Sequence, residues 1–464
     1  MHVGMGAFAL LLRWLAPWQA MLMAVAALVL NAFFLHGITR GALLRPEERA
    51  SGFSRGVVLY PAVLLVTFIV FRSRLELAAG VWALLAVGDG MAGLSGLALG
   101  GPRLPWNREK TWSGMAAFVL FGTAASAWII RWVQQGATGS LSFLVIGCLV
   151  ATTAAASAES LDTEVDDNIL VPLVGGAVLW AAALVDPGLL VAAGAATPGA
   201  VAAPAALTGA IGSWSAAWLT GVAITLPITV LAYLARAVDR SGAVAGALLA
   251  TVLYVFAGWP GFVMLGALMV FGTAVTRLGH IRKKALGVAE GRHGRSGGRR
   301  GIGSVAANAG AAVVFAFLAV ATPYPEAFTL AMVAAFATSL FDTTATEVGQ
   351  AFGRRAVLVT TWRAVPEGTP GGVSLVGTLA GVMGATLLAG AGWAMGLVAG
   401  LGALAVIFGA FCGSTLESFL GAMMGKGGRA DHHLRNLANT MVGAGVAWGL
   451  VALQIYLGGP GELP

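Results

Sequence analysis

Long apolar stretches separated by short polar segments run through the whole chain. Several of them reach about 18 residues, the length that an α-helix needs to cross a bilayer. Polar and apolar residues do not alternate within them, as they would in the strands of a membrane β-barrel. The pattern therefore predicts about 14 transmembrane helices. These are expected near residues 19–36, 57–71, 77–99, 112–132, 141–158, 169–185, 214–234, 242–257, 261–277, 302–320, 327–341, 372–389, 393–412 and 437–457.

The composition points to the same class of protein. Of the 464 residues, 58% are hydrophobic and only 10% are charged, and the mean hydropathy is +0.85. Soluble globular domains typically carry about 25% charged residues, so that class is excluded. We predict an all-α, polytopic integral membrane protein whose immediate partner is the lipid bilayer.

Lysine and arginine residues gather in some of the predicted loops and are absent from others. They cluster in the loops at 40–55, 103–110, 277–300, 354–363 and 426–435, whereas QQGATGS, GWPG and TPYP carry none. Short basic loops of membrane proteins face the cytoplasm. We therefore expect a bacterial-type inner membrane protein whose active sites, beside these loops, face the cytoplasm. Arg72 and Arg74 are the exception to this pattern. The distribution also accounts for the net charge of +7 without a nucleic-acid partner.

A segment rich in Ala, Gly and Pro at residues 186–213 interrupts the series of helices. Such a composition is typical of a linker. It divides the chain into an N-terminal membrane domain at 1–185 and a C-terminal membrane domain at 214–464. We expect these domains to form two helical bundles.

The two domains share a spacing of polar residues. The pattern D-x-x-A-x-x-x-G begins at Asp89 in the first domain and again at Asp342 in the second. Further along, each domain has a Glu-Ser pair, at Glu159 and at Glu417, followed by asparagine before an apolar helix. Because several such matches come in the same order, we predict that the two bundles are related.

In the first domain, Asp89 lies between two glycines in an otherwise apolar segment. A carboxylate is costly inside a bilayer, so it indicates a functional site. In the following loop, PWNREKTWSG, the cations Arg108 and Lys110 can meet phosphates, while Asn107 and Ser113 supply hydrogen bonds. The alternative is an ordinary cytoplasmic loop whose charges only set the topology.

The string ESLDTEVDDN adds a group of acids to this domain. If it is helical, Glu159, Asp162 and Asp166 fall on one face, and Asp167 and Asn168 add further oxygen atoms. Mg²⁺, or another divalent cation, chelated by nucleotide phosphates would offset their mutual repulsion, because it prefers oxygen ligands. A solvated acidic loop is the alternative.

The second domain contains two glycine-rich strings that favour anion binding. The first, EGRHGRSGGRRGIGSVAANAG, offers guanidinium groups at Arg292 and Arg295, with Ser304 and Asn308 one helical turn apart beyond them. The second, PEGTPGGVS, enters a helix whose first N–H groups can hold an anion. We assign phosphate binding in this string to Thr369, Gly371, Gly372 and Ser374. A plain loop with a helix cap is the alternative for this string.

Carboxylates and amides complete the candidate site of the second domain. Asp342 and Glu347 lie in the string DTTATE and are candidate metal ligands or general bases. Glu417 supplies a further carboxylate, which we assign to catalysis and metal binding. Asn436 and Asn439 begin the last apolar helix and are assigned to nucleotide or phosphate binding.

Two resemblances carry this interpretation further. The first domain resembles the phytol kinase and dolichol kinase group of polyprenol kinases, in the strings LLAVGDGMAGLSG, PWNREKTWSG and ESLDTEVDDNILVPL. The second domain resembles the integral-membrane family that includes phytyl-phosphate kinase. Its matching strings are GHIRKKALGVAE, GSVAANAG, DTTATEVG, VPEGTPGGVSLVG, GSTLESFLGA and NLANT, which add Lys283 and Ser414 to the candidate phosphate-binding residues.

Together the resemblances imply a bifunctional CTP-dependent enzyme. The first domain would phosphorylate a prenol such as phytol or geranylgeraniol, with Asp89 holding Mg²⁺–nucleotide or taking the alcohol proton. The second would convert the prenyl monophosphate to the diphosphate, with Asp342 as the counterpart. A lipid transporter or flippase is one alternative, since it too can have two related halves with intramembrane acids. A cytidylyltransferase that makes a CDP-lipid is the other.

Overall fold

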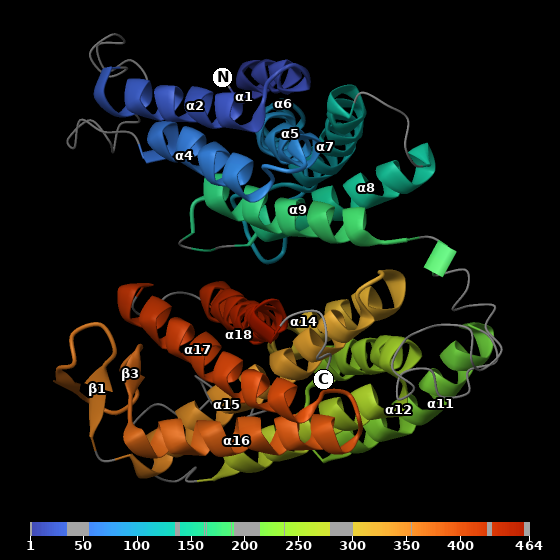
Figure 1. Cartoon of the computed structure of the whole chain (residues 1–464), viewed down its shortest axis with the longest axis vertical. Helices are drawn as coiled ribbons and strands as arrows, with labels where there is room; N and C mark the ends of the chain where they lie inside the picture. Colours follow the sequence, from blue (N-terminus) through green and yellow to red (C-terminus); the bar gives the residue numbers. More distant parts are fainter. Residues whose placement is uncertain are drawn as a thin grey trace. The chain divides into compact units, whose positions relative to one another are not determined.

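We describe the fold from a computed structural model of the chain. It describes residues 2–34, 55–134, 140–161, 163, 165–186, 188–189, 214–235, 237–278, 300–353, 355–424 and 429–458. The chain divides into two compact units, Met1–Leu184 and Val185–Pro464, and each is built almost entirely of helices (Figure 1). The predicted all-α class is confirmed.

Within the described residues, 11 helices are long and apolar enough to cross a membrane. Two short segments and one merged pair account for the difference from the expected number. Those near 19–36 and 57–71 are shorter apolar helices, Pro17–Phe33 and Gly56–Val70. Those at 242–257 and 261–277 form one long element, α12 (Arg240–Arg277), which is interrupted at Gly258, where φ is 62° and ψ is −160°. The apolar pattern therefore located the helices correctly. The break inside α12 lies between the two predicted segments that it joins.

Unit 1 is a bundle in which one span is assembled from three consecutive elements. These are α5 (Leu75–Ala83), the π-helical segment η4 (Leu84–Asp89) and α6 (Gly90–Leu99). The span packs against α7 (Trp112–Val133), α8 (Leu141–Glu159) and α9 (Asp167–Leu184). The remaining elements are α1 (His2–Gly6), η1 (Ala7–Arg13), α2 (Pro17–Val29), η2 (Leu30–Phe34) and α4 (Arg55–Val70).

Unit 2 surrounds one central helix, α15 (Pro325–Phe352), which is the most buried of the candidate spans in the described residues. Its neighbours are α12, α14 (Ile302–Ala321), α16 (Leu375–Ala394), α17 (Gly400–Met424) and α18 (Arg429–Gly458), while α11 (Trp214–Leu234) packs on α12. Three short strands, β1 (Ala356–Leu358), β2 (Ala364–Val365) and β3 (Gly372–Val373), pair antiparallel in the order β2-β1-β3. In Figure 1, β1 and β3 lie at one end of this unit, beside α17.

Small residues allow the last helices of unit 2 to approach closely. A Cβ atom added at Gly413 of α17 would lie 2.9 Å from the Thr338 side chain of α15 and 3.1 Å from the Gly443 backbone of α18. Close approach through small residues is the usual way in which membrane helices associate, because lipid supplies no hydrophobic drive between them. The polar residues of α15, α17 and α18 are thereby held within reach of one another.

Candidate functional site

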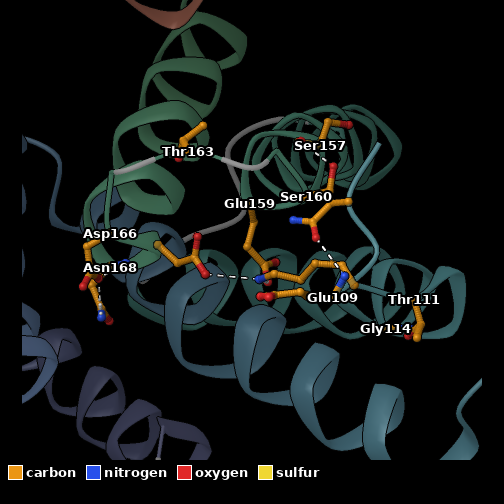
Figure 2. A network of polar contacts seen from close by, with 12 residues as sticks. Glu109, Thr111, Gly114, Ser157, Glu159, Ser160, Thr163, Asp166 and Asn168 are labelled. Atoms are coloured by element: carbon orange, nitrogen blue, oxygen red, sulfur yellow. Dashed lines mark hydrogen bonds and ion pairs between the residues drawn. The ribbon is translucent and has the colours of Figure 1, made fainter. Parts of the chain in front are cut away.

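In unit 1 a lysine joins three segments that are far apart in the sequence. Lys110, in the loop between α6 and α7, places its Nζ 2.6 Å from Glu159 Oε1 and 3.1 Å from Asp167 Oδ2 (Figure 2). Glu159 ends α8 and is 8% exposed, whereas Asp167 begins α9 and is 42% exposed. The loop, the end of one helix and the start of the next therefore meet at a single cation.

Backbone hydrogen bonds fix the loop that carries Lys110. The Leu104 N–H donates to the Lys110 carbonyl at 3.0 Å, and the Trp112 N–H donates to the Pro102 carbonyl at 3.1 Å. The loop thus folds back on itself before α7, which Thr111 caps by accepting from the Gly114 N–H at 3.1 Å. This geometry holds the lysine against α8 and leaves it little freedom.

The indole ring of Trp106 forms a second contact between the loop and the end of α8. Trp106 Nε1 donates to Ser160 Oγ at 3.0 Å, and Ser160 Oγ in turn donates to the Ser157 carbonyl at 2.7 Å. Figure 2 shows the Glu159 side chain pointing toward the part of the loop in which Glu109 lies.

The charge of Lys110 is stabilised by its surroundings. Burial disfavours the charged ammonium, but Glu159 and Asp167 more than offset this effect, so the pKa of Lys110 is raised above its ordinary value. The Lys110 side chain therefore stays protonated throughout the physiological pH range.

Asp89 lies at the end of the π-helical segment and is partly buried. It is close enough to Glu159 for the two negative charges to interact. Short π-helical segments within α-helices are frequent at functional sites, because the extra residue redirects the side chains that follow. Asp89, Glu159, Asp167 and Lys110 thus form one ionic group, with more negative than positive charges.

One expectation for this region was wrong. Glu159 and Asp166 do not share the face of a helix, because α8 ends at Glu159 and the next helix begins only at Asp167. Asp166 instead accepts bonds from the N–H of Asn168 at 2.9 Å and from its Nδ2 at 2.8 Å. Repulsion between carboxylates one turn apart and this local turn both oppose a continuous helix. Asp162 lies outside the described residues.

The other candidates of unit 1 have local roles in the structure. Asn107 Oδ1 accepts from the Glu109 N–H at 3.0 Å, and Ser113 Oγ donates to the Gly100 carbonyl. Arg108 is exposed. Asn168 Oδ1 is buried and has no hydrogen-bond partner in the part of the chain that the structure describes. These positions flank the ionic group. The assignment of Asn107, Arg108 and Ser113 to nucleotide binding, and that of Asn168 to metal binding, stay predictions.

Unit 2 contains a cavity of about 230 Å³ between α15, α16, α17, α18 and the segment that precedes α16. Seven residues predicted from the sequence line it, namely Asp342, Thr369, Gly371, Gly372, Ser374, Ser414 and Glu417. They come from three regions that are separated by up to 75 residues, Asp342 and Glu417 being the extremes. The fold therefore brings the glycine-rich string and both acids to one place.

The centre of this cavity is ionic. Arg435 Nε donates to Glu417 Oε1 at 3.2 Å, and the two side chains are only 11% and 16% exposed. Ser414 Oγ lies 3.4 Å from Asp342 Oδ1, and the charge of Asp342 interacts with those of Glu417 and Arg435. Arg435 Nη1 is buried without a hydrogen-bond partner among the described residues. Arg435 thus lines the cavity and keeps one guanidinium nitrogen that Glu417 does not satisfy.

The glycine-rich string is pressed against α17. Gly371 has a φ of 75°, and a Cβ atom there would lie 2.6 Å from both the Ser418 carbonyl oxygen and the Ala422 nitrogen. Only glycine fits such a conformation and such a close approach. Ser374 then caps α16 by accepting from the Gly377 N–H at 3.2 Å. The start of α16, with its unpaired N–H groups, lines the same cavity.

The remaining candidates of unit 2 lie elsewhere. Glu347 is buried on α15 but does not line the cavity, and neither do Ser304, Asn308, Asn436 and Asn439. Asn308 Nδ2 donates to the Ser304 carbonyl at 2.8 Å on α14, a helix that packs against α18. Three residues of the basic loop, Lys283, Arg292 and Arg295, lie outside the described residues.

The two asparagines of α18 are unusual in their burial. Asn439 is 1% exposed, and neither of its amide atoms has a partner among the described residues; the same is true of Asn436 Oδ1. Unpaired buried amides of this kind are expensive unless a ligand or water satisfies them. They lie on the same helix as Arg435, directly beyond the cavity lining.

Sequence reasoning missed several residues of the cavity, of which Glu367, His432 and Arg435 are ionisable. Arg435 was assigned to a basic loop because the apolar segment begins only at about 437. The structure extends α18 back to Arg429. The signal was present: residues 432, 435, 436 and 439 are polar at the spacing of one helix face.

The carboxylates bear on the predicted Mg²⁺. Within the described residues no group of three or more His, Cys, Asp or Glu side chains could hold a metal ion alone. Mg²⁺ usually binds one or two carboxylates together with substrate phosphates. Asp89 and Glu159 in unit 1, and Asp342 and Glu417 in unit 2, therefore fit a metal ion that arrives with a nucleotide.

Apolar spans that enclose partly buried ionic groups define a polytopic integral membrane protein with polar sites inside its helical bundles. Residues 223–450 match the family described as integral membrane protein DUF92, and the chain belongs to that family. The match covers the cavity of unit 2 and most of its helices.

Relatives of this family come from several kinds of organism. An uncharacterized membrane protein of Synechocystis is 39% identical over 207 residues, which cover 44% of this chain and 79% of that protein. Protein VTE6, chloroplastic, of Arabidopsis thaliana is 35% identical over 242 residues, which cover 50% of this chain and 73% of that protein.

Proteins named as phytol kinases are also similar. The Glycine max protein named "Probable phytol kinase 3, chloroplastic" is 28% identical over 186 residues, and the chain spans 58% of its length. No solved structure matches the chain.

Proposed function

We propose that this protein is a membrane phosphotransferase that carries out two successive steps on an isoprenoid lipid. Unit 1 would phosphorylate a prenol to the prenyl monophosphate with CTP, and unit 2 would phosphorylate that monophosphate to the prenyl diphosphate. The similarity to proteins named as phytol kinases and the membership of DUF92 support this proposal. The active sites would face the cytoplasm, where the nucleotide is available.

The observation that carries the proposal is the cavity of unit 2. It combines a glycine-rich turn, a helix N-terminus, the two acids Asp342 and Glu417 and the cation Arg435. Phosphoryl transfer depends on positioning and on stabilising the charge of the transferred group rather than on covalent catalysis. Backbone N–H groups and a guanidinium bind phosphate oxygens, whereas the acids would hold the Mg²⁺ that neutralises the nucleotide.

The two steps differ in their demand for a base. In unit 1 the hydroxyl oxygen of the prenol attacks the γ-phosphorus of CTP, CDP leaves, and the hydroxyl proton must be removed. Asp89 is the carboxylate that we assign to that proton. In unit 2 the acceptor is a phosphate monoester, whose oxygen is already ionised at neutral pH. Its site needs cations near the acceptor more than it needs a base.

The membrane setting suits such substrates. An isoprenoid tail dissolves in the bilayer, so only the hydroxyl or phosphate has to reach the polar residues. The polar lining of unit 2 lies toward the ends of α15 and α17 and at the start of α16 and α18. A substrate would therefore approach sideways from the lipid with its head group at that end of the bundle.

The test is to incubate the purified full-length protein in detergent with labelled CTP, Mg²⁺ and a panel of prenols. The expected products are prenyl monophosphate and prenyl diphosphate, with release of CDP. Release of inorganic diphosphate with a CDP-lipid would indicate a cytidylyltransferase. Absence of any product, together with uptake of prenyl phosphates into proteoliposomes, would indicate a transporter.

A further inference from the structure

The two units repeat the same junction between a span and the next helix. Thr111 and Ser374 each cap a helix, and each faces a glycine of the preceding span. A Cβ atom at Gly96 would lie 3.2 Å from Thr111 Oγ1, and one at Gly349 would lie 3.1 Å from Ser374 Oγ. Both glycines stand seven residues after the aspartate of the shared pattern. The shared sequence spacing thus corresponds to a shared contact in each unit.

About two helical turns away, a second contact between the same two helices recurs in both units, with the side chains exchanged. In unit 1 a Cβ atom at Gly88 would lie 2.8 Å from the nearest atom of the Phe118 ring, whereas in unit 2 a Cβ atom at Gly381 would lie 2.5 Å from the nearest atom of the Phe341 ring. Each pair joins the residue before the aspartate to the residue seven positions after the capping residue. The two positions thus face each other in both units, with glycine and phenylalanine exchanged between them. This agreement supports a common arrangement of the two units.

The last helices also correspond. Gly175 of α9 and Gly443 of α18 each pack closely on the span that carries the aspartate, with the nearest side-chain atoms coming from Leu84 and Thr338. Each glycine follows an asparagine by seven residues, so DNILVPLVG corresponds to RNLANTMVG. The residue before the asparagine therefore occupies an equivalent position in each unit.

At this position the charge is reversed between the units. Arg435 in unit 2 donates directly to Glu417. In unit 1 the equivalent residue is Asp167, and Lys110 bridges it to Glu159, which is the counterpart of Glu417. The cation of unit 1, Lys110, comes directly before the helix cap Thr111. The residue at the same place in unit 2, before the cap Ser374, is the uncharged Val373.

We propose that this exchanged position, Asp167 in unit 1 and Arg435 in unit 2, determines whether a site accepts a neutral hydroxyl or a phosphate monoester. The inference rests on the proposed function and assigns an acceptor class to each site. In unit 1 the cation at this place, Lys110, is already bound by two carboxylates, and an anionic acceptor there would meet the negative charge of Asp167. Arg435 has a buried N–H without a partner among the described residues, which suits a phosphate oxygen.

The electrostatic difference is large enough to select between acceptors. A phosphate monoester carries about −1.5 to −2 charges at pH 7. The guanidinium of Arg435 attracts it, whereas the carboxylate of Asp167 repels it. A prenol carries no charge and is indifferent to either residue apart from its hydrogen bonds. The sign of one side chain therefore changes the binding of one acceptor and spares the other.

The experiment measures prenol and prenyl monophosphate of the same chain length as separate acceptors, with the full-length protein in detergent and saturating Mg²⁺ and CTP. The wild-type protein is expected to phosphorylate both. If it phosphorylates neither, the proposed function fails and the acceptor assignment falls with it. If it phosphorylates both, the variants below test the assignment alone.

Arg435→Gln is expected to raise the KM for prenyl monophosphate at least about tenfold, because it removes one charged hydrogen bond. Phosphorylation of prenol should change little. Arg435→Lys keeps the charge and should retain most of the affinity. Arg355→Gln, an exposed arginine outside the cavity, is the matched control. Binding of prenyl monophosphate, followed by the shift in thermal unfolding, reports on the same interaction without catalysis. A rise confined to the KM for CTP would overturn the assignment.

A graft gives the sharper test. The double variant Val373→Lys and Arg435→Asp places the cation and the anion of unit 1 into unit 2. In an Asp89→Asn background, which silences unit 1, this graft should lose activity on prenyl monophosphate and gain measurable activity on prenol. An unchanged preference for the monophosphate in a folded variant would show that the acceptor class is set elsewhere.

Discussion

Lys110 Nζ and Glu159 Oε1 are separated by 2.6 Å, although the two residues are 49 positions apart in the sequence. This ion pair connects the loop before α7 to the last turn of α8. It places a cation between carboxylates in a bundle of membrane-spanning helices, where an isolated charge would be costly. The contact therefore joins two distant segments at the candidate site of unit 1.

Lys110→Met is expected to destabilise unit 1 because it leaves Glu159 partly buried without its cation. Losing one partner of a buried pair costs roughly 3–5 kcal/mol. Since the Lys110 side chain is 34% exposed, we expect less, about 1–3 kcal/mol. Thermal unfolding in detergent measures the effect. The double variant Lys110→Met and Glu159→Gln should recover part of the loss, and a cost equal to the sum of the single variants would contradict the pairing.

Asp89→Asn should abolish conversion of prenol to monophosphate and leave conversion of monophosphate to diphosphate intact. The amide keeps the shape of the carboxylate but removes the charge needed for proton abstraction or metal binding. Product chromatography with each acceptor measures the two steps separately. Glu109→Gln changes an exposed acid of the same unit and should have no effect. Equal loss of both steps would argue against independent sites.

Asp342→Asn and Glu417→Gln should have the reverse effect. Monophosphate should accumulate from prenol and CTP, because unit 1 continues to work while unit 2 has lost a carboxylate of its cavity. The time course of both products, followed by chromatography, checks this. A variant that still makes diphosphate at the wild-type rate would remove that residue from the second step.

Gly371→Ala should impair the second step and lower stability. The φ of 75° is strained for alanine, and the added Cβ would lie 2.6 Å from the Ser418 carbonyl oxygen. A strained backbone of this kind costs about 1–3 kcal/mol. Gly390→Ala is the control, because an added Cβ there meets nothing within 4 Å and the site lies inside α16. The prediction fails if both variants unfold at the same temperature and retain equal activity on the monophosphate.

Mg²⁺ alone should leave the unfolding temperature almost unchanged, whereas Mg²⁺ and CTP together should raise it. The reason is that no group of three metal-binding side chains occurs among the described residues, so nucleotide phosphates must complete the coordination. Binding at a hundredfold excess over Kd stabilises by about 2.7 kcal/mol. A full shift with Mg²⁺ alone would indicate a metal site made by the protein.

Hydrophobicity alone predicted the helices well, because the cost of exposing backbone to lipid allows few alternatives. The site was harder to predict. The acids, the glycine-rich string and Ser374 were found from their types and spacing. Arg435 was overlooked because a charged residue just before an apolar segment resembles a topology signal. Its function as a partner of Glu417 depends on how far α18 extends and which face it turns inward, and neither is visible from hydrophobicity.

The pairing of Lys110 with Glu159 was also beyond reach of the sequence. Both residues were expected to belong to one site, but as a phosphate ligand and a metal ligand. The end of α8 at Glu159 and the folded loop bring them into direct contact instead. The sequence predicted an open acidic face in this region, whereas the folded chain pairs Glu159 with Lys110.

The exchanged glycine and phenylalanine in the two units limit how the chain can be recombined. A chimera with the first span of unit 1 and α16 would place Gly88 against Gly381 and leave a void the size of a phenyl ring. The opposite chimera would force Phe341 against Phe118 in space for a single ring. Helices from the two halves are thus no longer interchangeable, even though each half follows the same plan. Exchanging single helices between the two halves is therefore expected to lower stability, because a packed core tolerates neither a large void nor a second ring in the space of one.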